Sequence, residues 1–260
     1  LPGAYYPPTI LADVRPGMPA YDEEIFGPVA SVIRVMDEKE AIPFAVFKPT
    51  GFGRFALYQK VSEGKELNSS EAVEWQNVVN RYEKAAKACS DKGIGLLIDA
   101  EESWMQKAAD DLIEQLMEKY NKEKVVVFGT LQLYRHDRFD YLKELHQKAK
   151  ERGYKIGMKL VRGAYMEKER ERAEDLNYED PICSDKKSTD QNFNRVLSYM
   201  FEHLEDMAIF NGTHNEESSY LMMDLIEKSE YSKKDPRLWF GQLFGMSDNI
   251  SFNLADQGFN

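Results

Sequence analysis

The stretch KIGMKLVRGAYMEKER, residues 155–170, contains the pattern that decides the fold. A mostly apolar run of strand length, residues 155–161, ends at Val161 and includes Lys159. A charged, helix-compatible segment follows Gly163. Lys159 and Arg162 therefore lie at the end of a strand that we expect to be buried, where an unpaired charge is costly. A polar site shared by several strand ends would explain why these charges are tolerated.

The same alternation of apolar strand and amphipathic helix recurs from Pro43 onward. The predicted strands are 43–48, 94–99, 124–130, 155–161, 207–213 and 237–244. Apolar strands separated by helices are typical of a parallel sheet covered on both faces. The sequence lacks the G-x-G-x-x-G loop of dinucleotide-binding sheets, which favours a barrel. We predict an α/β fold of the (β/α)8 TIM-barrel type, incomplete because only six βα units are present.

The first 42 residues have a different character from the rest of the chain. Six of the ten prolines lie among the first 28 residues. Proline lacks an N–H donor and disfavours helix at the residue before it, so we expect short extended segments and turns here. The sequence therefore predicts two parts, 1–42 and 43–260.

Composition excludes several classes of partner. The formal net charge of -11 disfavours nucleic acid and anionic membranes as partners. No apolar run is long enough for a membrane span, and the first residues do not resemble a signal peptide. Cys89 and Cys183 are far apart and belong to no metal-ligand cluster, so we expect free thiols, no metal site and a reducing, cytoplasmic compartment.

A polar residue stands at or just beyond the end of each predicted strand, and barrel active sites lie at the carboxyl ends of the strands. The candidates are Lys48, Asp99, Gln132, Tyr134, Lys159, Arg162, Thr213, His214, Asn215 and Gln242. Some neighbouring charges have a simpler explanation. Glu101 and Glu102 suit a helix N-terminus capped by Ser103, and EKERERAE (167–174) suits a solvated helix face.

Residues 43–260 resemble the catalytic barrel of the flavin-dependent proline dehydrogenases in six motifs that occur in the same order. These are FAVFKPTGFGRFALYQK, LLIDAEESWMQ, TLQLYRHDR, GMKLVRGAYMEKER, GTHNEESSY and WFGQLFGMSDNISFNLA. The resemblance implies an FAD-dependent oxidoreductase of proline catabolism, which converts L-proline to 1-pyrroline-5-carboxylate and passes electrons to a quinone. It also implies that contact with the membrane is transient and that no metal is used.

The resemblance assigns roles to particular residues. Lys48 and Asp99 would contact proline, Leu160 would pack against it, and Lys159 would lie beside the flavin ring. Cations and hydrogen-bond donors there would stabilise the anionic reduced flavin. The remaining FAD contacts would be Gln132, Val161, Arg162, Gly163, Ala164, Thr213, His214 and Asn215.

Residues 1–42 resemble a different family, the NAD(P)-dependent aldehyde dehydrogenases of the succinate-semialdehyde type. The matching phrases are YYPPTILADV (5–14) and YDEEIFGPVASVIRV (21–35). In that family Glu24 and Phe26 would contact the nicotinamide riboside. The nucleotide-binding fold and the catalytic cysteine segment are absent, so we expect only a fragment of such an enzyme.

One departure from the proline dehydrogenase pattern leaves the activity open. The family holds the substrate carboxylate with an arginine pair in a motif resembling YLIRRAEEN, whereas this sequence stops at FNLADQGFN. Truncation would then impair turnover. Two alternatives remain: a Schiff-base lyase or aldolase that uses Lys48 or Lys159 as the amine nucleophile, and a catalytically inert fusion fragment.

Overall fold

The computed structural model describes residues 43–243 and 245–260 in full, and the backbone of residues 9–14 and 29–33. The chain divides into two compact units, Leu1–Pro43 and Phe44–Asn260. In the first unit, β1 (Thr9–Val14) and β2 (Val29–Ile33) pair as parallel strands. Glu24 and Phe26, the predicted nicotinamide contacts, lie outside the described residues.

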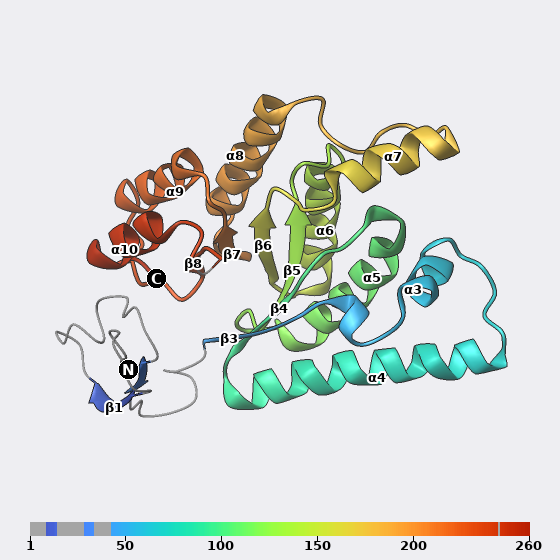
Figure 1. Ribbon diagram of the computed structural model, residues 1–260, viewed down its shortest axis with the longest axis horizontal. Coiled ribbons are helices and arrows are strands. Elements are labelled where there is room, and N and C mark those ends of the chain that lie inside the picture. The colour runs from blue at the N-terminus through green and yellow to red at the C-terminus, as the bar shows by residue number, and fades with distance from the viewer. Residues whose placement is uncertain (1–8, 15–28, 34–42, 244) are drawn as a thin grey trace, which may run out of the picture. The chain divides into compact units, whose positions relative to one another are not determined.

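The second unit is built on one sheet of six parallel strands in sequential order (Figure 1). The strands are β3 (Phe44–Phe47), β4 (Gly95–Ile98), β5 (Val127–Gln132), β6 (Ile156–Val161), β7 (Met207–Gly212) and β8 (Leu238–Gly241). A doubly wound sheet reverses its strand order at a switch point, whereas this sheet does not. The prediction of an incomplete TIM-type barrel with six βα units is confirmed.

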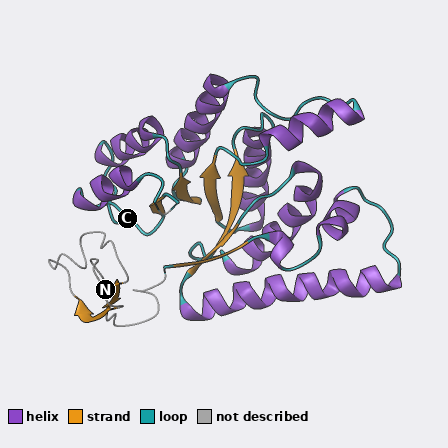
Figure 2. Cartoon of the chain, in the orientation of Figure 1, coloured by secondary structure: helices purple, strands orange, loops and turns teal. Residues whose placement is uncertain are grey.

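Helices connect the strands, as Figure 2 shows. They are η1 (Pro49–Gly51), α3 (Phe55–Ser62), α4 (Ser69–Lys92), α5 (Ser103–Tyr120), α6 (Arg138–Arg152), α7 (Met166–Leu176), α8 (Lys186–Glu202), α9 (Glu216–Glu227) and α10 (Asp248–Asp256). Among the described helices, none is both long and apolar enough to cross a membrane.

Aromatic rings fill the inner face of the curved sheet. The ring of Phe44 in β3 lies edge-on to Phe128, Phe210 and Trp239, with centroids 5.6, 5.2 and 4.9 Å away. These contacts join β3, the first strand of the six-stranded sheet, to β5, β7 and β8 across the barrel interior. Gly95 leaves space for this layer, because a Cβ there would lie 2.4 Å from the Phe44 ring. The charged strand ends stand beyond this aromatic layer.

β5 begins three residues later than the apolar run predicts. The side-chain oxygen of Asn121, which ends α5, accepts hydrogen bonds from the backbone nitrogens of Val126 and Val127, both at 2.9 Å. The Asn121 side-chain nitrogen donates to the backbone oxygens of Val127 and Lys155. This buried amide binds the backbone that leads into β5, so residues 124–126 precede the strand.

The described chain ends beside the outer edge of β8. Gly258, at φ 81°, turns the backbone, and the nitrogen of Phe240 donates to the oxygen of Asn260 at 3.0 Å. Equivalent bonds run from Leu96 to Val126 and from Ile209 to Arg237. In those two bonds the acceptor is the residue just before the next strand, and Asn260 pairs with β8 in the same way.

Candidate active site

Three charged side chains meet at the carboxyl ends of β3, β4 and β6. Asp99 accepts a hydrogen bond from Lys159 Nζ at 2.7 Å, and its other oxygen lies 3.7 Å from Lys48 Nζ. Lys159 and Asp99 are largely buried, with 19% and 21% of their side chains exposed, whereas Lys48 is 53% exposed. We call Lys48, Asp99 and Lys159 the charged triad. With two ammonium groups and one carboxylate it carries a net positive charge that favours an anionic ligand group.

Tyr165 extends the charged triad, because its hydroxyl lies 3.5 Å from Lys48 Nζ. Burial lowers the pKa of Lys48, but the Tyr165 hydroxyl and the Asp99 carboxylate outweigh burial and raise it above the ordinary value. Lys48 is therefore protonated at neutral pH. A protonated amine is a poor nucleophile, which counts against Lys48 in a Schiff-base reaction.

Glu101 connects the loops that carry the charged triad. It is buried and accepts hydrogen bonds from the backbone nitrogen and the hydroxyl of Thr50 at 2.8 and 2.7 Å. The side-chain nitrogen of Gln132 donates to the Glu101 backbone oxygen at 2.7 Å. The prediction that Glu101 serves only a helix N-terminus is wrong, since it joins the loop after β3 to the loop after β4.

Arg162 lies in a second polar cluster, between β6 and β7. Its guanidinium donates to Asp190 of α8 at 2.8 Å, to the Thr213 hydroxyl at 2.7 Å and to the Ser218 hydroxyl at 3.1 Å. Burial raises the pKa of Asp190, but Lys186 and Arg162 outweigh it and hold this pKa below the ordinary value. Arg162 and Thr213, both predicted site residues, are thus brought together.

The residues around Arg162 differ in what they can contact. Leu160 is completely buried in the main hydrophobic core, on the helix-facing side of β6 opposite Lys159. Leu160 thus packs against the core in this structure, and its contact with proline stays a prediction. Val161 is partly exposed, and Gly163 and Ala164 are exposed. Gly163 has φ 128°, and a Cβ there would lie 2.4 Å from the Tyr134 ring, so the turn requires glycine.

The residues after β7 and β8 form a third polar group. The exposed His214 ring lies 3.0 Å from the Ser247 hydroxyl through Nδ1. The Asn215 side chain caps α9 by accepting from the Ser218 nitrogen at 2.9 Å. Gln242 donates to the Thr213 backbone oxygen at 3.2 Å. The predicted strand-end residues therefore stand at one end of the sheet, and most of them join one of three hydrogen-bonded groups. The buried Tyr134 hydroxyl has no hydrogen-bond partner among the described residues.

Residues 23–260 match the family model described as proline dehydrogenase. The chain belongs to the proline dehydrogenase family. The match begins inside the segment predicted to be an aldehyde dehydrogenase fragment and gives that assignment no support.

Curated relatives of this proline dehydrogenase family member are longer than the chain. The carbapenem antibiotics biosynthesis protein CarD of Pectobacterium carotovorum subsp. carotovorum is 33% identical over 228 residues, which is 88% of this chain and 58% of CarD. Proline dehydrogenase 1, mitochondrial, of Homo sapiens is 34% identical over 196 residues, 74% of this chain and 33% of that protein. The chain thus spans between a third and three fifths of these relatives.

A solved structure has the same fold. Proline utilization A from Bdellovibrio bacteriovorus, inactivated by N-propargylglycine, aligns with a TM-score of 0.71 at 20% identity. The alignment covers 94% of this chain and 23% of the other. It places the chain in the barrel architecture of the proline dehydrogenase family.

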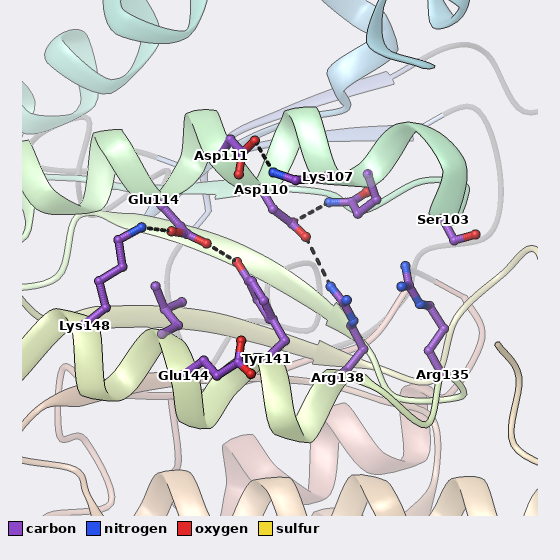
Figure 3. Close-up of a pocket in the computed structure, with 12 residues that line it drawn as sticks. Ser103, Lys107, Asp110, Asp111, Glu114, Arg135, Arg138, Tyr141, Glu144 and Lys148 are labelled. Atoms are coloured by element: carbon purple, nitrogen blue, oxygen red, sulfur yellow. Dashed lines mark hydrogen bonds and ion pairs between the residues drawn. The ribbon is translucent and has the colours of Figure 1, made fainter. Parts of the chain in front are cut away.

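A separate polar hollow in this proline dehydrogenase family member lies between α5 and α6 (Figure 3) and has a volume of about 460 Å³. Two ion pairs cross it from one helix to the other. Arg138 donates to Asp110 at 3.1 Å, and Lys148 is paired with Glu114. The hollow contains none of the predicted site residues. The strand ends therefore remain the candidate active site.

Proposed function

We propose that this chain oxidises L-proline to 1-pyrroline-5-carboxylate at the carboxyl ends of its barrel strands. The observation that carries the proposal is the charged triad, in a chain that belongs to the proline dehydrogenase family. The relatives named proline dehydrogenase are longer proteins, and this chain spans only part of their length. The activity of the chain itself is therefore our inference.

The charges of the triad suit a zwitterionic amino acid. Lys48, which is protonated and half exposed, would bind the proline carboxylate through a charge-assisted hydrogen bond. Asp99 would face the proline amine and keep Lys159 oriented through their 2.7 Å bond. Both charged groups of the substrate would then be held at the triad.

FAD is the acceptor that we propose, and a quinone would take the electrons from it. The donor set at the strand ends fits a flavin, because Lys159 and Arg162 supply cations and Thr213 and His214 supply hydrogen-bonding groups at neighbouring strands. When bound, FAD would supply the hydride-accepting ring. Lys159 would favour negative charge on that ring. Gln132, Val161, Gly163, Ala164 and Asn215 complete the proposed cofactor contacts.

Turnover tests this proposal. Protein purified with FAD should reduce a soluble quinone analogue when L-proline is added, and Lys48→Met should raise the KM for proline. Lys187→Ala, on the exposed first turn of α8, is the matched control and should behave like the unmodified chain. Unchanged proline kinetics in Lys48→Met would remove the charged triad from the proposed mechanism.

A second candidate function rests on the similarity to CarD, which extends over 88% of this chain. The chain would then serve the biosynthesis of a carbapenem antibiotic instead of proline catabolism. Deletion of the gene separates the two. Loss of growth on proline supports catabolism, whereas loss of antibiotic production with growth on proline intact supports biosynthesis.

The location and the first unit complete the proposal. We place the chain in a bacterial cytoplasm, with transient access to a membrane-held quinone.

We further propose that residues 1–42 derive from an aldehyde dehydrogenase and contribute nothing to proline oxidation. Residues 1–42 contain no cysteine, so this segment by itself lacks the nucleophile that aldehyde dehydrogenase chemistry needs.

A further inference from the structure

Helix α7 carries a buried carboxylate that the proposed reaction does not use. Figure 1 shows α7 beyond the carboxyl ends of β5 and β6. Glu169, in the first turn of this helix, is completely buried. The sequence predicts a solvated helix face here, and for Glu169 that prediction is wrong. A buried carboxylate needs partners that offset the loss of its hydration.

The partners of Glu169 come from the start of α5. The backbone nitrogen and the hydroxyl of Ser103 each donate to one Glu169 oxygen at 2.6 Å. Glu102, the N-cap residue of α5, makes no side-chain capping bond. The first turn of a helix has unsatisfied N–H groups and a positive dipole end, which suit a carboxylate. Glu169 therefore caps α5 from another helix, in place of the local cap that Ser103 was predicted to provide.

Two weaker contacts join the same helices. Lys168 lies 3.1 Å from Glu102, and the Arg172 guanidinium lies 4.6 Å above the Trp104 ring. Lys168 is mostly exposed, so its ion pair contributes little. Within the part of the chain that the structure describes, no cation is paired with Glu169. The capping contact to Ser103 is thus the buried attachment of α7 to α5.

This attachment lies one helical turn from Tyr165, which contacts the charged triad through Lys48. The backbone nitrogen of Glu169 donates to the oxygen of Tyr165 at 3.0 Å, and the Tyr165 hydroxyl lies beside Lys48. Gly163, whose φ of 128° suits glycine, precedes this turn and allows the backbone to change direction. Fixing Glu169 therefore fixes Tyr165 relative to Lys48.

We infer that Glu169 is a positioning residue, which caps α5 and thereby holds α7 so that Tyr165 orients Lys48. The inference deepens the proposed function, because Lys48 is the group that we expect to bind the substrate carboxylate. The positions of α7 and Lys48 can also be measured without any turnover. The two ideas can therefore fail separately.

The first test is hydrogen exchange in Glu169→Gln. Glutamine keeps the volume but removes the negative charge, and its side-chain nitrogen cannot accept the hydrogen bond that one of the two Glu169 oxygens takes from Ser103. Amides of residues 166–176 should exchange at least about tenfold faster, with those of β4–β6 unchanged, as expected for local opening. Glu167→Gln, exposed on the same helix, is the matched control. Exchange at the unmodified rate in Glu169→Gln would overturn the inference.

The second test measures Lys48 directly. Acetylation of Lys48, followed by mass spectrometry, should be several-fold faster in Glu169→Gln than in Glu167→Gln, because Tyr165 no longer holds its ammonium group. Ser103→Ala removes one of the two bonds and should give an intermediate rate, which also serves if Glu169→Gln does not fold. Equal rates in all variants would show that α7 does not orient Lys48.

The third test connects the inference to proline. In a chain that oxidises proline, Glu169→Gln should raise KM about tenfold with little change in kcat, because ground-state binding is lost. An unchanged KM together with fast Lys48 acetylation would overturn the role in substrate binding. A chain that never oxidises proline would overturn the proposed function, while the first two measurements would still decide the position of α7.

Discussion

Asp99 is the side chain on which the charged triad depends, because it contacts both lysines. Asp99→Asn should lower kcat/KM for proline. Losing a charged contact to a buried ligand costs about 2–5 kcal/mol, which is roughly one and a half to nearly four orders of magnitude. Steady-state kinetics measure the loss. Asp111→Asn, which breaks only an exposed pair with Lys107, should change little, and equal kinetics in both variants would contradict the account.

Asn211 offers a residue-scale prediction about stability. It is completely buried in β7, and neither atom of its amide has a hydrogen-bond partner among the described residues. Asn211→Leu should raise the free energy of unfolding by about 1 kcal/mol, since an unsatisfied buried polar group is removed. Urea unfolding measures the change. Asn192→Leu is the control and should destabilise, because Asn192 donates to the Leu133 and Arg135 carbonyls.

The sequence predicted Lys48, Asp99 and Lys159 because each charge stands at the end of an apolar strand. Leu160 lies in the main hydrophobic core and points away from the Lys159 side chain, since successive strand residues point to opposite faces. Glu169 could not have been found in this way. Its partner Ser103 is 66 residues away, and a run of alternating charge carries no signal of burial.

The start of α6 gives a prediction at the scale of an element. Burial raises the pKa of Asp137, but Arg138 and Arg135 outweigh it and hold this pKa at about 2. The unfolded value is about 3.9. The folded pKa is depressed, so the stabilisation is present above about pH 4 and is lost as pH falls toward 2. As pH falls from about 4 toward 2, the urea midpoint of unfolding should therefore fall less steeply for Asp137→Asn than for the unmodified chain. The same dependence of the midpoint on pH in both chains would contradict the prediction.

The predicted strands all exist, because continuous apolar runs between amphipathic helices are a strong signal. Their limits depend on tertiary contacts that a single sequence does not reveal. β5 begins late because Asn121 binds the backbone that precedes it. The N-terminus of α5 likewise depends on Glu169 of another helix, not on the local cap that the sequence suggested.

At the scale of the molecule, the division into two units predicts that the second folds by itself. Among the residues whose side chains the structure describes, the aromatic layer and the main core of this unit are made by residues after Pro43. A chain of residues 43–260 should therefore retain the far-ultraviolet circular dichroism of the barrel, FAD binding and proline kinetics. Loss of cooperative unfolding in the shortened chain would show that residues 1–42 support the barrel.

We propose that L-proline, held at the strand ends of this barrel, gives up a hydride to a bound flavin. The most direct measurement is the visible absorption of the FAD-loaded protein when L-proline is added without oxygen or quinone. We expect the oxidised flavin band to disappear in the unmodified chain and to persist in Asp99→Asn. An oxidised band that survives excess L-proline in the unmodified chain, or a chain that binds no FAD, would contradict it.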